Sequence, residues 1–204
     1  MIICLSYHSG VEIRWESVSL MIKHKGTITL YTDRLILRRF TKEDATDMFA
    51  NWASDPEVTR YLSWLPHKDI KITRNIISSW LSLYKKPDYY NWAIVPKNYG
   101  RVIGSIGVVD TSEKNYRCEI GYCLSKRYWN QGIMTESLRA VISYLVKEIG
   151  FKRVQAVHQV ENVASGRVML KSGMKYEGRL RGYALNNRNE LVDCEMYAIL
   201  ETDI

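Results

Sequence analysis

Residues 128–137 constrain the fold most, because they join a strand-like run to an amphipathic helical pattern through a short polar turn. Residues 118–124 are apolar and aromatic enough for a strand, and after the turn apolar residues recur every three or four positions. At such a junction the first helical N–H groups lack partners within the helix and carry partial positive charge. The turn can therefore hold a phosphate or pyrophosphate, and Gly132 lets a ligand approach the backbone. The alternative is an ordinary helix start in which Thr135 and Glu136 are first-turn residues.

Length and charge narrow the class of protein. At 204 residues with 46% hydrophobic content, the chain can bury a sizeable core in a single domain. No apolar run reaches about eighteen residues, which argues against a membrane-spanning helix. Lys and Arg number 29 against 22 Asp and Glu, and the net charge of +7 favours an anionic partner. Because the basic residues are dispersed, a phosphorylated cofactor or an acidic surface is favoured over nucleic acid.

The cysteines indicate a reducing compartment. None of the four forms a CxxC pair or has a histidine at ligand spacing, so we expect no structural zinc and no metal site. Without a convincing secretory signal, the expected location is the cytoplasm, with free thiols. Cys118, Cys123 and Cys194 lie in strand-like runs, and we expect them mainly to pack the core. The four are Cys4, Cys118, Cys123 and Cys194.

The chain alternates between helical and strand patterns in an order that predicts a mixed α/β domain over residues 27–204. Residues 1–26 form an N-terminal extension of uncertain role, in which Met21 is a possible alternative start. The sheet is expected to be mostly antiparallel, with helices on both faces and one parallel pair joined by the helix after the phosphate turn. Expected strands cover residues 30–40, 90–95, 102–109, 118–124, 153–160, 180–185 and 191–200. Expected helices begin near residues 41, 56, 69, 135 and 162.

The helix that begins after Asp69 is expected to bury one apolar stripe against the sheet. Its members are Ile72, Ile76, Trp80 and Leu83.

Several short motifs follow one another in a familiar order. They are residues 32–38, 103–107, 119–122 and 129–136, then Asn162 with Ser165, and finally residues 171–174. Together they resemble the GNAT acyltransferase superfamily, and more narrowly its RimJ/RimL-like branch of ribosomal-protein N-terminal acetyltransferases. The resemblance covers about residues 27–200. It implies a GNAT-like fold whose sheet splays between its two central parallel strands.

The resemblance implies acetyl-CoA as the donor substrate, with its pyrophosphate on the turn before the central helix. Leu124, at the end of the preceding strand, would pair with the pantetheine arm, and a nearby N–H would polarise the thioester carbonyl. Trp129 departs from the family pattern, in which Arg or Gln is common, and Met134 stands where a small residue is usual. Neither change removes a backbone donor. The residues expected to bind the pyrophosphate are Gln131, Gly132, Ile133, Met134 and Thr135.

Asn162 and Ser165 match the family's second cofactor-contacting segment. The alternative is that Asn162 is an N-cap and Ser165 a first-turn residue of a short helix. Met169 stands where many members carry a tyrosine that protonates the departing thiolate. That role is then vacant, unnecessary or filled by Ser165.

The implied chemistry is direct attack of an amine on the acetyl thioester in a ternary complex. Glu119 is the candidate base, because it lies on the central strand near the expected acetyl position. Glu119 and Tyr122 point to opposite faces of a regular strand, so only one can meet the amine unless a bulge intervenes near Gly121. The alternative for Glu119 is a structural ion pair with an Arg or Lys of a neighbouring strand. His158 fits a sheet histidine better than a catalytic one.

Three functions remain open: acetylation of a protein or peptide N-terminal α-amine, acetylation of a small amine such as an antibiotic or polyamine, and non-catalytic acyl-CoA binding. The protein would act as a monomer or homodimer. The acceptor pocket is expected between the helices of residues 55–84 and the hairpin of residues 186–189. Asp193 either meets the amine or faces solvent. Aromatic residues that either line this pocket or belong to the core are Tyr61, Trp64, Trp80, Tyr84, Tyr89 and Tyr90.

Overall fold

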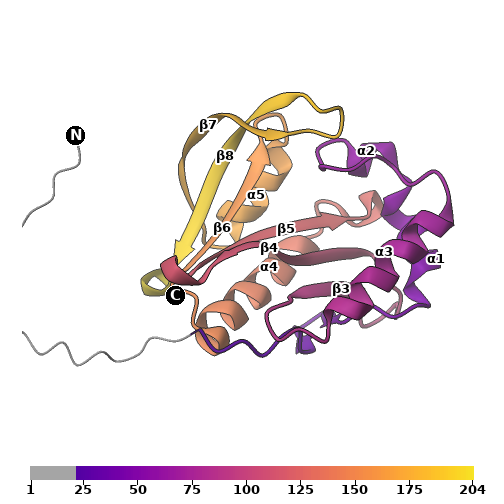
Figure 1. Ribbon diagram of the computed structural model, residues 1–204, viewed down its shortest axis with the longest axis horizontal. Coiled ribbons are helices and arrows are strands. Elements are labelled where there is room, and N and C mark those ends of the chain that lie inside the picture. Colours follow the sequence, from indigo (N-terminus) through magenta and orange to yellow (C-terminus); the bar gives the residue numbers. More distant parts are fainter. Residues whose placement is uncertain (1–21) are drawn as a thin grey trace, which may run out of the picture.

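The computed structural model describes residues 22–204, and its strands form one eight-stranded sheet in the order β1-β2-β3-β4-β5-β6-β8-β7 (Figure 1). Neighbouring strands are antiparallel except β5 and β6, which are parallel as predicted from the helical crossover between them. The strands are β1 (Leu30–Tyr31), β2 (Leu35–Arg38), β3 (Asn91–Pro96), β4 (Gly104–Ser112), β5 (Arg117–Leu124), β6 (Arg153–Gln159), β7 (Lys175–Leu185) and β8 (Leu191–Leu200).

Five α-helices connect these strands. Asp55 and Asp69 cap α2 and α3, each accepting a backbone N–H two residues on, as expected for aspartate at an N-cap. Gly150, with φ 98°, ends the helical segment that contains α4 in a left-handed conformation. The helices are α1 (Asp44–Met48), continued by a π-helical turn (Phe49–Ala53), α2 (Pro56–Thr59), α3 (Ile70–Leu83), α4 (Ile133–Tyr144), continued by a π-helical turn (Leu145–Ile149), and α5 (Val163–Lys171).

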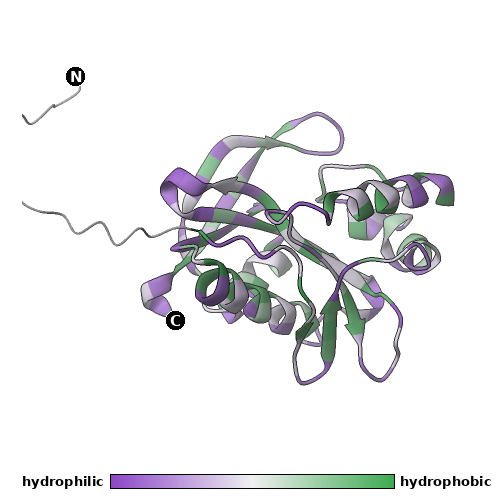
Figure 2. Ribbon diagram, turned by 60° about the horizontal axis from the view of Figure 1, so that its bottom comes forward, coloured by the Kyte–Doolittle hydropathy of each residue, from purple (hydrophilic) through white to green (hydrophobic). Residues whose placement is uncertain are grey.

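Two hydrophobic cores lie on opposite faces of the sheet. On one face α4 and α5 cover the strands through residues such as Leu138 and Met169. On the other, α1 and α3 pack through residues such as Met48 and Ile77. Figure 2 shows largely hydrophobic central strands and helices of mixed hydropathy, as expected when a helix buries one face only. The predicted architecture, a mixed and mostly antiparallel sheet with helices on both faces, is confirmed.

The two parallel strands separate soon after they meet. Pairing between β5 and β6 covers residues 117–119 and 153–155, at the N-terminal ends of both strands. Beyond Glu119 the strands diverge, and the second half of β5 turns backbone groups towards the gap. This splay opens the sheet beside the N-terminal ends of α4 and α5.

Two sequence expectations about local structure are wrong. The single strand expected over residues 30–40 is two short strands, β1 and β2, which pair with each other across a turn at residues 32–34. In α3 the fully buried residues are Thr73 and Ile77, whereas Ile72 and Ile76 are 41% and 36% exposed. Of the predicted stripe, Trp80 does pack against the core. Thr73 is accommodated inside because its hydroxyl lies 2.8 Å from Nδ1 of the buried His67.

The start of the described chain packs on the sheet domain. The Lys23 N–H donates to the carbonyl of Ile149 at 2.8 Å, and Nδ1 of His24 lies 2.8 Å from the Tyr90 hydroxyl. The possible start at Met21 lies outside the described residues. In residues 22–204 no helix combines the length and the apolarity that a membrane crossing requires.

Candidate active site

The turn before α4 presents a row of backbone donors. Gly132 is the N-cap of α4 with φ 73° and ψ 2°, and no side chain caps the helix. Within the described part of the chain, the N–H groups of residues 131–135 have no protein acceptor. Together with the helix dipole, these donors make the turn suitable for an anion.

Arg34 and Glu136 fix this turn to the rest of the sheet. The Arg34 guanidinium donates to the Gln131 carbonyl at 2.9 Å and to the Glu136 carboxylate at 2.6 Å. Glu136 also accepts from the Thr32 hydroxyl at 2.5 Å and from the Arg34 N–H at 2.9 Å. Burial acts to raise the pKa of Glu136, but these hydrogen bonds outweigh it and lower the pKa. The β1–β2 turn therefore holds the anion-binding turn in place.

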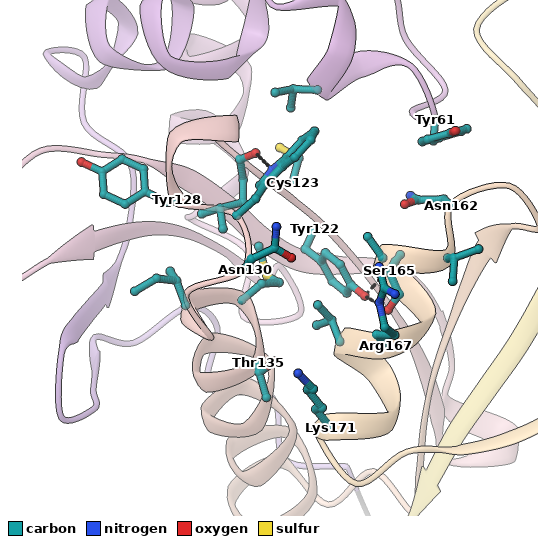
Figure 3. Close-up of a pocket in the computed structure, with 18 of the residues that line it drawn as sticks. Tyr61, Tyr122, Cys123, Tyr128, Asn130, Thr135, Asn162, Ser165, Arg167 and Lys171 are labelled. Atoms are coloured by element: carbon teal, nitrogen blue, oxygen red, sulfur yellow. Dashed lines mark hydrogen bonds between the residues drawn. The ribbon is translucent and has the colours of Figure 1, made fainter.

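A cavity of about 620 Å³ is bounded by α2, by α5, by the splayed edge of β5 and by the turn that precedes α4 (Figure 3). The tip of the β7–β8 hairpin bonds to α2, since Asn187 donates to the Thr59 carbonyl at 3.0 Å. Two cations of α5 line the cavity, Arg167 and Lys171. Sequence reasoning missed both, although their spacing of four residues places them on one face of the helix. Predicted residues that line the cavity are Leu124, Gly132, Ile133, Met134, Thr135, Asn162 and Ser165.

Two predicted residues are placed differently. Gln131 is outside the cavity lining, and its side chain donates to the Arg127 carbonyl at 2.9 Å. Its backbone N–H remains part of the row of donors. Glu119 is also absent from the lining.

The splayed edge of β5 offers backbone groups to the cavity. The Ser125 N–H donates to Ile103 of the segment before β4 at 2.8 Å, and hydrogen-bonded residues alternate along an antiparallel pair. Tyr122 and Leu124 therefore direct their N–H and C=O groups away from β4, towards the gap. The indole N–H of Trp129 donates to the Leu124 carbonyl at 2.8 Å.

Tyr122 reaches across the cavity to α5. Its hydroxyl oxygen lies 2.9 Å from the Ser165 Oγ and 3.2 Å from the Ser165 carbonyl oxygen (Figure 3). Burial raises the pKa of Tyr122 and outweighs the opposing effect of the Ser165 hydrogen bond, so the phenol stays protonated. Met169 is 1% exposed, belongs to the core and does not line the cavity.

Glu119 lies on the opposite face of β5, as the alternation from Tyr122 predicts. It is half-buried and accepts from the Gln155 side chain at 2.9 Å, so its partner on the neighbouring strand is an amide rather than the Arg or Lys considered from sequence. Burial, and next the charge of Glu119, raise the pKa of Tyr183 on β7. The one-residue bulge is in β4 at Val109, opposite this part of β5.

Of the other residues considered as site residues from the sequence, Asn162 lines the cavity and His158 has structural partners. Asn162 is the N-cap of α5, but its side chain makes no capping hydrogen bond. His158 is 5% exposed and stacks on Tyr197, with Nδ1 2.7 Å from the Gln159 carbonyl.

Asp193 accepts from Arg179 at 2.8 Å and from the Gly182 N–H at 2.8 Å. Of the aromatic residues proposed for the acceptor pocket, Tyr61 lines the cavity. Tyr84 and Tyr90 are buried in the two cores.

The family described as an acetyltransferase (GNAT) domain matches residues 34–175. The chain belongs to this family. This GNAT chain is 36% identical over 172 residues to the uncharacterized N-acetyltransferase YoaA of Bacillus subtilis, covering 84% of the chain and 96% of the relative. It is 22% identical over 166 residues to the ribosomal protein uS5 alanine N-acetyltransferase of Escherichia coli, covering 78% of the chain and 84% of the relative.

A solved structure of RimL, a ribosomal L7/L12 α-N-protein acetyltransferase in complex with coenzyme A, has a TM-score of 0.75 at 21% identity. The match covers 85% of this chain and 98% of that one, and at this identity it shows the fold. Membership of the GNAT family, with YoaA as a relative, identifies the chain as an N-acetyltransferase that takes its acetyl group from acetyl-CoA and transfers it to an amine.

Proposed function

We propose that the chain acetylates the N-terminal α-amine of a protein or peptide, as a RimJ/RimL-like member of the GNAT family. The relatives named above that act on ribosomal proteins support this acceptor class. The observation that carries it is that Glu119 is only half-buried and lies outside the enclosed cavity. Tyr183, which lies near Glu119, is 45% exposed, so an amine could arrive from solvent at the end of a longer chain. Small-molecule sites usually enclose most of their ligand.

The cavity supports the expected place of acetyl-CoA. The N–H groups of residues 131–135 would bind the pyrophosphate, with Lys171 and Arg167 adding positive charge at the cavity wall. Because Trp129 already occupies the Leu124 carbonyl, the pantetheine arm would pair with the Tyr122 carbonyl and the Leu124 N–H. The proposed acetyltransferase domain comprises residues 27–204.

In the proposed reaction Glu119 acts as the base. An α-amine has an ordinary pKa of about 8 and is mostly protonated at neutral pH, so loss of a proton must precede or accompany attack. Glu119 lies on the face of β5 away from Tyr122. Pairing between β5 and β6 ends at Glu119, so the gap beyond it connects the two faces of the sheet. The amine would attack through the gap, while an N–H of the β5 edge polarises the acetyl carbonyl.

The test measures thiol release from acetyl-CoA with a panel of acceptors. We expect turnover with peptides that carry a free α-amine, and loss of turnover when the same peptides are blocked at the α-amine but keep an internal lysine. A polyamine and an aminoglycoside antibiotic serve as small-amine comparisons. Turnover only with the small amines would overturn the proposed acceptor, and tight coenzyme A binding with no turnover on any acceptor would support a binding module instead.

A further inference from the structure

The contact between Tyr122 and Ser165 joins the central strand to α5 inside the cavity. A phenol has one proton to donate, and here two oxygens are within reach, the Ser165 Oγ at 2.9 Å and the Ser165 carbonyl at 3.2 Å. The carbonyl lies within α5, where helical geometry already supplies an N–H donor four residues on. The closer Oγ is therefore the better acceptor for the Tyr122 proton.

Donation by Tyr122 sets the direction of the Ser165 hydroxyl. Once Oγ accepts from Tyr122, its own hydrogen is free to point into the cavity. Ser165 is the third residue of α5, so the partial positive charge of that helix N-terminus lies at the same place. A hydroxyl group that accepts from a neutral phenol and lies at a positive helix end directs its own hydrogen towards a ligand atom that becomes negative.

One atom of the donor substrate becomes negative during transfer. When the amine nitrogen bonds to the acetyl carbon, the C–S bond breaks and its electron pair stays on sulfur, while the amine proton passes to the base. If the pantetheine follows the β5 edge past Leu124 towards Tyr122, the sulfur arrives beside Ser165. This step rests on the cofactor placement in the proposed function.

We infer that Tyr122 is a positioning residue for the departing thiolate, because it holds the Ser165 hydroxyl in the orientation that donates a hydrogen bond to sulfur. The hydrogen stays on Ser165 throughout, since an alcohol is a far weaker acid than a thiol. The thiolate leaves as an anion and later takes a proton from solvent. A hydrogen bond from Ser165 to the thiolate thus takes the place of the protonation by Ser165 that was considered from the sequence. The tyrosine that many family members carry at the position of Met169 is then not needed.

The experiment titrates the thiol of coenzyme A bound to the intact protein, followed by the ultraviolet absorbance of the thiolate. Bound coenzyme A should have a thiol pKa about one unit below that of free coenzyme A, the size expected for one hydrogen bond to a charged group. Tyr122→Phe and Ser165→Ala should each abolish most of this shift, and the double variant should add nothing further. The Kd for coenzyme A should change less than about threefold, because phosphate contacts dominate binding.

Tyr144→Phe is the matched control. Tyr144 is a buried tyrosine of α4 whose hydroxyl donates to the Gly26 carbonyl at 2.7 Å, away from the cavity lining. It should leave the thiol pKa unchanged even if it lowers stability. A bound thiol pKa equal in wild type and Tyr122→Phe, or additive effects of Tyr122→Phe and Ser165→Ala, would overturn the inference while leaving the cavity as the cofactor site. Failure of the wild type to bind coenzyme A would overturn the proposed cofactor site as well.

Discussion

Replacing Gly132 by alanine tests whether the left-handed turn before α4 binds the cofactor. Gly132 has φ 73°, and a non-glycine residue in this conformation costs about 1–2 kcal/mol. A Cβ there would meet the end of the Arg34 side chain at 3.4 Å, an ordinary contact, so backbone strain is the main effect. Arg34 holds Gln131 and Glu136 on either side of Gly132, so in the free protein the strain should be relieved locally, by rotation of the exposed backbone at residue 132.

Binding must then restore the left-handed conformation. We expect Gly132→Ala to raise the Kd for coenzyme A roughly fivefold to thirtyfold, the equivalent of about 1–2 kcal/mol. Isothermal titration calorimetry measures this Kd, and urea unfolding measures the accompanying change in stability.

Gly100 provides the control, because it has φ 71° with no atom near the position of a Cβ and lies in the turn between β3 and β4. Gly100→Ala carries the same kind of strain and should leave the Kd unchanged. Binding of coenzyme A by Gly132→Ala within about twofold of wild type would show that the left-handed turn does not hold the cofactor.

Three further predictions address Glu136, Glu119 and Gly166. The folded pKa of Glu136 is lowered, so its stabilising contribution is present above the ordinary carboxyl pKa and is lost as the pH falls through the folded value. The stability advantage of wild type over Glu136→Gln in urea unfolding should therefore be constant near neutrality and narrow below about pH 4; a constant difference down to pH 2 would contradict it. Glu119→Gln should reduce turnover more at neutral pH than at high pH, where the amine loses its proton unaided, and an equal reduction at every pH would remove Glu119 as the base. Gly166→Ala would bring a Cβ within 2.6 Å of the buried His158 ring. The substitution should lower the free energy of unfolding by about 1–3 kcal/mol, and a loss below about 0.5 kcal/mol would exclude tight packing at this position.

Local periodicity explains why the central part of the fold could be predicted. β5, the turn and α4 are neighbours in sequence, so hydrophobic spacing and one glycine indicate the junction without knowledge of the rest of the chain. The anion-binding character of the turn follows from the same local pattern, because unpaired helical N–H groups are a property of any helix start.

Features that depend on distant residues could not be predicted in this way. The break at residues 32–34 is stabilised by hydrogen bonds to Glu136, about a hundred positions later. The face of α3 that is buried depends on packing against the sheet, which turns Ile72 outward and admits Thr73. The contact of Tyr122 with Ser165 spans 43 residues and exists only because β5 and α5 flank the same gap.

A crystal structure of the protein with coenzyme A tests the central claim most directly. The pyrophosphate should accept hydrogen bonds from the N–H groups of residues 131–135, the pantetheine should pair with the β5 edge at Tyr122 and Leu124, and the sulfur should lie within hydrogen-bond reach of the Ser165 hydroxyl. Coenzyme A bound away from this turn, or with its sulfur distant from Tyr122 and Ser165, would contradict the account.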